Sequence, residues 1–251
     1  MTLPDHLIAA NQYGRYCVPR SSQTRPAAAA VLAGNVWEAG VIAFMARNCG
    51  AGDIVHAGTY FGDFLPALSR ALGNAAQLWA FEPSSENHAC ARRTVEMNNL
   101  RNVSLLHAGL GARADTKPLC IASLDGAWGG ASHIVKEKPL DGVCEDVRIV
   151  ALDEIVPRER NVSIVQLDVE GYEQQALKGA LEILKRCLPI LILENLPRNP
   201  KWHERNILAL GYREIGAISR NRILTASPDD PPDFDAYRDR PLRRRRSCRG
   251  E

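Results

Sequence analysis

Glycine and carboxylate residues follow short apolar runs at several places in this 251-residue sequence. Gly58 and Gly62 come after the run DIVHA, Glu82 ends the run QLWAFE, and Asp168 ends the run VSIVQLD. Glycine lets a ligand approach the backbone closely, and a carboxylate can accept the two hydroxyl groups of a ribose or take a proton from a reacting group. These residue types predict a site that binds a nucleoside-like ligand and performs acid–base chemistry.

The segments that carry these residues alternate between apolar strands and helices. We expect strands over 53–57, 77–82, 102–108, 162–168 and 189–195, and helices over 62–72, 84–100, 173–187 and 201–211. This alternation predicts an α/β fold with a doubly wound, mostly parallel sheet, helices on both faces and a C-terminal antiparallel hairpin over 213–227. Ligands bind such sheets at the carboxyl ends of the strands, where the glycines and carboxylates lie.

The charge of the chain is nearly balanced, with 31 basic and 29 acidic residues and a net charge of +2. The last nine residues hold five arginines and one glutamate, which leaves 26 basic and 28 acidic residues elsewhere. A nearly neutral body predicts no nucleic-acid-binding face. The segment 228–251, rich in Pro and Asp and then in Arg, is predicted to be a disordered tail.

Seven cysteines are scattered along the chain without a CxxC pair. This spacing predicts reduced thiols and no disulfide framework or zinc site. The N-terminus has no signal-peptide pattern, and the longest clean apolar run, residues 188–193, is too short to span a bilayer. We therefore expect a cytoplasmic protein with no membrane span.

Two features bear on which nucleoside-like ligand the site binds. The loop from Gly58 to Gly62 has the form G-x-x-x-G and lacks the three-glycine pattern that brings a pyrophosphate onto a helix. The fourth strand ends in QLDVEGYE, whose acidic side chains suit a sulfonium cation and would be poorly placed near a pyrophosphate. The pattern favours S-adenosylmethionine. A nicotinamide-dependent oxidoreductase stays as an alternative, although no second catalytic domain is recognisable.

Residues 35–195 resemble the FkbM-type S-adenosylmethionine-dependent methyltransferases. The resemblance rests on the segments DIVHAGTYFGD, WAFEPSSENHACARRTVEMNNLRNV, IVQLDVEGYEQQALKGA and PILILEN. It implies a class I, Rossmann-like methyltransferase fold, S-adenosylmethionine as methyl donor and, usually, O-methylation of a small molecule such as a sugar or secondary metabolite. We expect the methyltransferase domain at 53–227, after an N-terminal helical cap or lid at 1–52.

One residue departs from the family's first motif, which usually has an acidic residue where this sequence has His56. A neutral imidazole can still accept a hydrogen bond. His56 therefore bears on cofactor affinity more than on cofactor identity. It also leaves a non-catalytic partner protein that binds an adenosyl ligand as a second alternative.

The expected cofactor site follows the ends of the first three strands. The loop from Gly58 to Asp63 would line the methionine portion, Glu82 would hold the ribose, and His107 with the two residues after it would flank the adenine. The full set of predicted cofactor-binding residues is His56, Gly58, Thr59, Tyr60, Phe61, Gly62, Asp63, Glu82, His107, Ala108 and Gly109.

For catalysis, the sequence favours Asp168, which ends a core strand, with Glu170 and Glu173 as its supporting group. His133, in the loop GGASHIV, and His203 are alternative general bases, although each fits a surface histidine better.

Asp168, Glu194 and Asn195 end neighbouring strands and are candidate oxygen ligands for Mg²⁺, which would chelate an acceptor diol. The alternative is that these groups cap helices and order loops.

The segments 11–28 and 123–138 are expected to roof the site, because the predicted core accounts for neither. Trp128, Tyr13 and Tyr16 are candidate stacking surfaces for a sugar ring, with core packing as the ordinary alternative. The expected partner is thus a small-molecule acceptor, while the sequence leaves its identity and the oligomeric state open.

Overall fold

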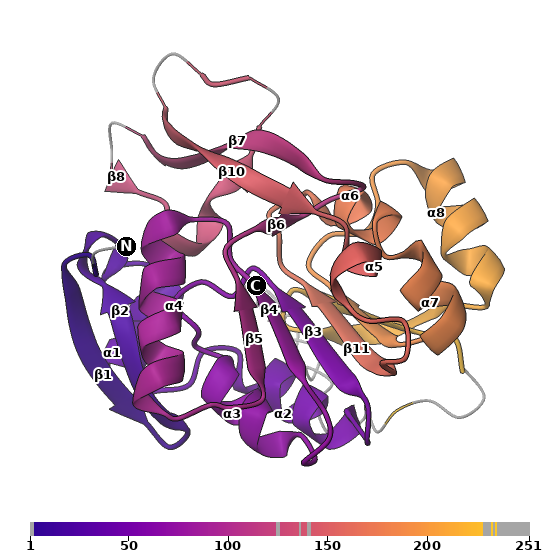
Figure 1. Cartoon of the computed structure of the whole chain (residues 1–251), viewed down its shortest axis with the longest axis horizontal. Helices are drawn as coiled ribbons and strands as arrows, with labels where there is room; N and C mark the ends of the chain where they lie inside the picture. The colour runs from indigo at the N-terminus through magenta and orange to yellow at the C-terminus, as the bar shows by residue number, and fades with distance from the viewer. Residues whose placement is uncertain are drawn as a thin grey trace, which may run out of the picture.

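The computed structural model describes residues 3–123, 126–135, 137–139, 142–227, 232 and 234. Within these ranges, the largest sheet has seven strands in the order β13-β14-β12-β11-β3-β4-β5 (Figure 1). Its parallel strands are β3 (Asp53–Ala57), β4 (Leu78–Phe81), β5 (Val103–Leu106), β11 (Val162–Leu167) and β12 (Ile190–Leu193). Its antiparallel edge is the hairpin of β13 (Arg213–Ile218) and β14 (Asn221–Thr225). The predicted α/β fold, with a mostly parallel sheet and a C-terminal hairpin, is confirmed.

Neighbouring side chains of a strand point to opposite faces of the sheet, and here both faces are buried. Ile54 and Ile164 belong to one core cluster, and Val55 and Val165 belong to the other. The first cluster includes residues of α2 (Ala39–Asn48) and α3 (Leu65–Ala71). The second includes residues of α5 (Leu152–Ile155), α6 (Glu173–Lys178) and α7 (Leu181–Cys187). This double burial explains why these strands read as continuous apolar runs in the sequence.

The predicted helix over 173–187 is divided at Gly179, which separates α6 from α7. A Cβ at Gly179 would overlap the backbone oxygen of Gly111. The close approach of the two backbones therefore requires a residue without a side chain, and the helix breaks there. The predicted helix over 201–211 becomes α8 (Pro200–Asn206) and the short helix η3 (Leu208–Leu210).

The N-terminal segment predicted to be a helical cap contains a hairpin as well as helices. Residues His6–Asn11 (β1) and Gly14–Pro19 (β2) form an antiparallel hairpin, followed by η1 (Arg20–Ser22) and α1 (Pro26–Leu32). The hairpin packs on α4 (Ser85–Met97), where the backbone N–H of Cys17 donates to the Thr94 hydroxyl at 3.0 Å. Figure 1 shows β1 and β2 beside α4, at the edge of the molecule.

A second sheet lies between β5 and β11 in the chain, and we call it the cap sheet. It contains β6 (Gly109–Leu110), β7 (Asp115–Ser123), β8 (Gly126–Ala127), β9 (His133–Ile134) and β10 (Val143–Val150), with η2 (Gly129–Ala131) between β8 and β9. In this sheet β10 pairs antiparallel with β7 and parallel with β6. Figure 1 shows β7 and β10 along the top of the molecule.

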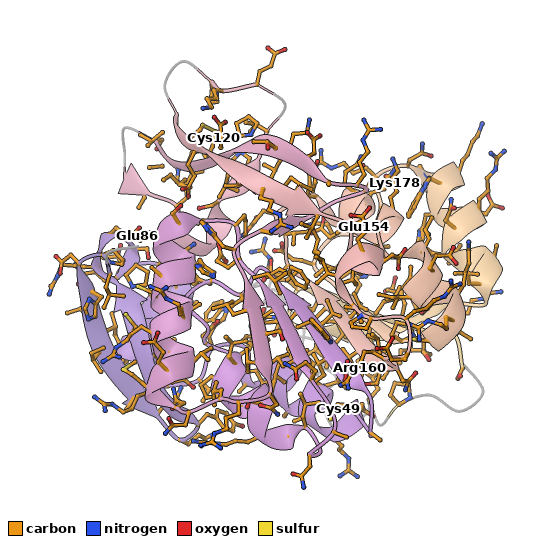
Figure 2. All side chains as sticks on the ribbon, viewed as in Figure 1. Cys49, Glu86, Cys120, Glu154, Arg160 and Lys178 are labelled. Atoms are coloured by element: carbon orange, nitrogen blue, oxygen red, sulfur yellow. A yellow bond between two sulfur atoms is a disulfide. The ribbon has the colours of Figure 1, made fainter. Side chains whose placement is uncertain are left out.

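Cys120 of β7 and Cys144 of β10 form a disulfide, so the prediction of reduced thiols is wrong for this pair. The two residues are separated by 24 positions and become neighbours only because the strands pair. Among the other described cysteines, none is disulfide-bonded: Cys17, Cys49, Cys90 and Cys187 are free thiols. Figure 2 shows Cys120 in the cap sheet, on the opposite side of the molecule from Arg160.

The predicted tail over 228–251 lies outside the described residues apart from Pro232 and Phe234. The Phe234 ring is buried and meets Phe44 edge to face, with ring centroids 6.1 Å apart. Across the described part of the chain, we find no helix with the length and apolar character needed to span a bilayer.

Candidate active site

The loop after β3 is held at the carboxyl ends of the central strands by backbone contacts. The N–H groups of Gly58 and Thr59 both donate to the carbonyl of Phe81, at 3.1 Å. Gly58 has φ +83°, and a Cβ there would overlap the backbone oxygen of Asp168. Only glycine fits this combination of a left-handed conformation and close approach. The predicted ligand loop and the predicted catalytic strand end are therefore in direct contact.

Glu82 follows β4 and fixes the same loop from its other side. Its carboxylate accepts hydrogen bonds from the backbone N–H groups of Tyr60, at 2.7 Å, and Ser84, at 2.9 Å. Tyr60 has φ +52°, so this hydrogen bond supports an unusual backbone conformation. Glu82 is only 4% exposed, and burial raises its pKa to about 7.

A cavity opens between these loops and the cap sheet. Glu82, Ala108 and Gly109 line it from the ends of β4 and β5, together with Gly58 and Tyr60 from the loop after β3. The remaining wall is largely apolar and small, and includes Phe81, Leu110, Leu119, Gly129, Gly130 and Ile134. We call this space the ribose cavity because Glu82, the residue predicted to hold a ribose, lies in its wall. It brings together five of the predicted cofactor-binding residues.

Other predicted cofactor residues lie outside the ribose cavity. Thr59 is fully buried and its hydroxyl donates to the carbonyl of His56 at 3.3 Å. Phe61 packs edge to face against Tyr16, and Gly62 turns the chain toward α3 with φ +83°. These three residues fix the shape of the loop and do not line the ribose cavity.

His107 lies beside the ribose cavity and is not part of its lining. One of its ring nitrogens, Nε2, is 3.0 Å from the carbonyl oxygen of Pro83. Its ring stacks on His88 with centroids 4.6 Å apart. His107 thus supports the chain between β4 and α4.

A second space, which we call the acidic cleft, has a volume of about 200 Å³. It shares Gly58, Tyr60, Gly130 and Asp168 with the ribose cavity. Five carboxyl groups line it, against the guanidinium groups of two arginines: Glu38, Asp63, Asp168, Glu170, Glu194, Arg25 and Arg220. His56 and Asp63, predicted to bind cofactor, lie in this cleft. Burial raises the pKa of Asp63 to about 7.

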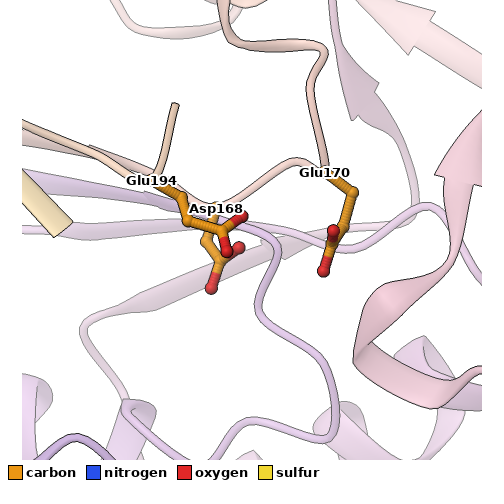
Figure 3. Close-up of side chains that lie close together, drawn as sticks. All are labelled: Asp168, Glu170 and Glu194. Carbon is orange, nitrogen blue, oxygen red and sulfur yellow. The ribbon is translucent and has the colours of Figure 1, made fainter. Parts of the chain in front are cut away.

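Asp168, Glu170 and Glu194 form a carboxylate cluster in this cleft, with one oxygen from each lying within 4.8 Å of the others. Asp168 directly follows β11 and its N–H donates to Ala57, while the N–H of Glu194 donates to Leu167. The parallel strand ladder therefore sets the spacing of these two residues. Figure 3 shows the three carboxylates extending in the same direction.

Burial and mutual repulsion change the acidity of this cluster. Burial, followed by the neighbouring charge of Glu194, raises the pKa of Asp168 well above its usual value. The same two causes raise the pKa of Glu170 to about 7. The cluster thus retains protons at a pH where exposed carboxylates have lost them.

Glu173 and Asn195 lie beside the cluster and are bonded to each other. Glu173 is 2% exposed and accepts hydrogen bonds from the N–H of Gly171, at 3.3 Å, and from the amide of Asn195, at 3.2 Å. These contacts order the loop before α6. The structure therefore adds Glu170 to Asp168 and Glu194, while Asn195 contacts the cluster through its amide N–H, which also donates to Glu194 at 3.3 Å.

The histidines and aromatic residues predicted near the site lie in different places. His133 stacks on Trp128, with centroids 4.9 Å apart, and lines a larger groove of about 740 Å³ beyond Glu170. His203 lies on α8 and lines neither the ribose cavity nor the acidic cleft. Tyr16 is fully buried, and Tyr13 packs on the first core cluster, so both have a packing role.

The sequence did not predict the contributions of Arg25, Glu38, Gln166 and Arg220 to the acidic cleft. Glu38 and Arg220 come from outside the segments that carry the strand-end pattern. Gln166 lies within an otherwise apolar strand, and a buried polar residue at such a position signals a hydrogen-bond partner. That partner is His56, directly opposite on β3.

A family model described as a methyltransferase FkbM domain matches residues 48–215. No curated protein matches the chain significantly.

Among solved structures, the chain is similar to a methyltransferase FkbM from Methylobacillus flagellatus KT, with 17% identity and a TM-score of 0.44 over 70% of this chain and 43% of that one. It is also similar to a putative O-methyltransferase from Klebsiella pneumoniae, with 12% identity and a TM-score of 0.40 over 74% of this chain and 77% of that one. A third is the tRNA (uracil-54, C5)-methyltransferase of Pyrococcus abyssi in complex with S-adenosyl-L-homocysteine, with 14% identity and a TM-score of 0.43 over 87% and 43% of the two chains. The chain spans less than half of the Methylobacillus protein.

Proposed function

The chain belongs to the methyltransferase FkbM domain family, and we propose that it transfers a methyl group from S-adenosylmethionine to a hydroxyl oxygen of a small molecule. The observation that carries this proposal is the junction of the ribose cavity and the acidic cleft at Gly58, Tyr60 and Asp168. A methyl donor in the cavity and an acceptor hydroxyl in the cleft would face each other across this junction.

The ribose cavity supports a specific placement of the cofactor. The two ribose hydroxyls would donate to the Glu82 carboxylate, as expected of an acidic residue at the end of the second strand of such a sheet. The adenine would lie along Ala108 and Gly109, against the apolar side chains of Leu119 and Ile134. The methionine portion would extend toward Gly58, where the backbone approaches closely.

In the transfer, a lone pair of the acceptor oxygen attacks the methyl carbon in line with the sulfur. The new O–C bond would form as the C–S bond breaks. The electron pair of the C–S bond would go to the sulfur, which would leave as the neutral thioether of S-adenosylhomocysteine. The hydroxyl proton passes to the Asp168 carboxylate. Positioning supplies much of the rate in such a displacement, and a base with a raised pKa accepts the proton more readily.

The neighbouring groups support Asp168 as the base over the alternatives. Asp168 lines both the ribose cavity and the acidic cleft, whereas Glu170 lines only the cleft, and Glu173 is occupied with ordering the loop. His133 stacks on Trp128 and lines the larger groove, away from the junction.

The charge of the acidic cleft supports a small, hydroxyl-bearing acceptor such as a sugar or a secondary metabolite. Carboxyl groups outnumber guanidinium groups in the cleft five to two, so it offers few of the basic contacts to phosphates on which nucleic-acid binding depends. A cleft of about 200 Å³ accommodates one ring-sized group.

The proposal is tested by calorimetric titration with S-adenosylmethionine, S-adenosylhomocysteine and NAD⁺ in parallel. We expect micromolar binding of the two adenosyl ligands and none of NAD⁺. Glu82→Ala should weaken adenosyl binding at least tenfold, since it removes the ribose acceptor, while Glu182→Ala, which removes an exposed carboxylate on α7, should not. Binding of NAD⁺ alone, or unchanged binding by Glu82→Ala, would overturn the placement. Binding without turnover of any hydroxyl acceptor would favour a non-catalytic partner protein.

A further inference from the structure

The carboxylate cluster of Asp168, Glu170 and Glu194 has the dimensions of a site for one divalent cation. Mg²⁺ binds oxygen ligands at about 2.1 Å, so oxygens on opposite sides of the ion are about 4.2 Å apart, and for Ca²⁺ the corresponding separation is about 4.6–5.2 Å. One oxygen from each of the three carboxylates lies within 4.8 Å of the other two. One ion can therefore contact all three with little movement of the side chains.

A second, independent observation comes from His56 in the wall of the same cleft. The ring is 2% exposed and stacks on Phe64, with centroids 4.9 Å apart. Its Nδ1 pairs with Oε1 of Gln166, so the neutral ring presents Nε2 as an acceptor. Nε2 is buried and has no hydrogen-bond partner among the described residues. A buried acceptor of this kind calls for a donor from a bound ligand, such as water held by a metal ion.

We propose that Asp168, Glu170 and Glu194 bind a divalent cation in the acidic cleft, and that His56 accepts a hydrogen bond from a water molecule on that ion. Hard oxygen ligands of this kind select Mg²⁺, Mn²⁺ or Ca²⁺ over softer metals. In this ligand set Glu170 takes the predicted place of Asn195, because the Asn195 amide N–H donates to Glu173 and Glu194 whereas Glu170 offers a carboxylate oxygen to the cluster.

The inference rests on the proposed function and specifies how the acceptor is held. An ion in this cluster is adjacent to the junction with the ribose cavity, since Asp168 lines both spaces. Two neighbouring hydroxyls of the acceptor would occupy positions on the ion that the three carboxylates leave open. The ion would also acidify the hydroxyl that accepts the methyl group. The acceptor class that fits is therefore a vicinal diol or a related chelating pair of oxygens.

The test measures Mn²⁺ binding to the purified full chain by electron paramagnetic resonance, in which the signal of free aqueous Mn²⁺ disappears on binding. We expect one site with submillimolar affinity that Mg²⁺ competes for. Glu170→Gln and Glu194→Gln should each weaken Mn²⁺ binding at least tenfold, and His56→Phe should weaken it severalfold. Glu182→Gln is the matched control, because this carboxylate is exposed on α7 and pairs with Lys185. The control should bind Mn²⁺ like wild type.

Folding of the variants is checked by thermal melts in chelator-treated buffer. Each Gln variant removes one of several mutually repelling carboxylates, so its Tm should not fall below that of wild type. Mn²⁺ should raise the Tm of wild type and leave that of Glu194→Gln unchanged.

A titration with S-adenosylhomocysteine on the same samples separates this inference from the proposed function. Intact S-adenosylhomocysteine binding without stoichiometric Mn²⁺ binding overturns the cation site alone. Equal Mn²⁺ binding by Glu194→Gln and the control overturns it too. If wild type does not bind S-adenosylhomocysteine, the proposed function is overturned instead.

Discussion

Glu82 should make adenosyl binding depend on pH in a way that can be calculated. Ribose hydroxyls donate hydrogen bonds, so they bind the ionised carboxylate in preference to the protonated one. Burial raises the pKa of Glu82 to about 7. About one molecule in eleven is then ionised at pH 6 and about ten in eleven at pH 8, so affinity should rise about tenfold between these values.

The assay is calorimetric titration with 5′-deoxy-5′-methylthioadenosine at pH 6, 7 and 8. This ligand keeps the ribose and lacks the amino acid portion, whose α-amino group titrates near pH 8 and would obscure the effect. Repeating the titration in buffers of different ionisation enthalpy counts the protons released. We expect close to one proton at pH 6 and almost none at pH 8.

Two variants identify the group responsible. Glu82→Gln cannot ionise, so its binding should be weak and independent of pH. Asp63→Asn is the matched control, because burial also raises the pKa of Asp63 to about 7 but its side chain lines the acidic cleft. A tenfold rise that persists in Glu82→Gln and disappears in Asp63→Asn would refute the reasoning, as would equal wild-type affinity at pH 6 and 8.

Glu82 should also make the stability of the unliganded protein depend on pH, but in the opposite sense: a rise in pH that strengthens adenosyl binding should lower the free energy of unfolding. Its pKa is higher in the folded chain than in the unfolded one, because folding buries it. The stability that it contributes is fully present below the unfolded pKa, near 4.5, and is lost as the pH rises through about 7. Ribose binding should restore part of this loss, so the ligand-induced rise in Tm should be larger at pH 8 than at pH 6.

Three further predictions concern the scaffold. Gly58→Ala should abolish adenosyl binding and lower the free energy of unfolding by more than about 2 kcal/mol, since a Cβ would overlap backbone in a left-handed conformation; Gly73→Ala, where a Cβ meets nothing within 4 Å, should do neither. Asp53→Ala should lower the free energy of unfolding in urea by about 1–3 kcal/mol, because it leaves the backbone N–H of Gln77 and the indole N–H of Trp79 without their acceptor; an unchanged urea midpoint would contradict this. Non-reducing peptide mapping should recover Cys120 linked to Cys144, and Cys120→Ser should cost about 2–4 kcal/mol relative to the oxidised protein; free thiols at both positions would contradict the pairing.

Much of the central sheet could be predicted because its strands are buried on both faces. Residues such as Ile54 and Val55 serve opposite cores, so the run is apolar throughout and short enough to be a strand. Gly58, Glu82 and Asp168 could be selected because parallel strands present their carboxyl ends at one edge. The positions of these residues at strand ends were then sufficient to predict that they lie in one site.

The remaining features depend on contacts between distant segments. The N-terminal hairpin has a half-polar alternation, and its stability comes from α4, far along the chain. Cys120 and Cys144 become partners only once β7 and β10 are in register, and no spacing rule encodes that. Glu38 reaches the acidic cleft from the segment before β3, and there it holds Asn221 near the other end of the chain.

The place of the cap sheet in the chain has a consequence for how this protein can diversify. The chain leaves the parallel sheet after β5, at its edge, and re-enters it at β11, beside β3 in the middle. The cap sheet occupies that excursion, and its residues Gly130 and Ala131 line the acidic cleft. A lengthened or replaced excursion leaves the register of the seven-stranded sheet unchanged, and with it Gly58 and Glu82 at the strand ends. The excursion also contributes Leu119 and Ile134 to the ribose cavity, so a change in this single segment would reshape the walls of both spaces around fixed strand-end residues.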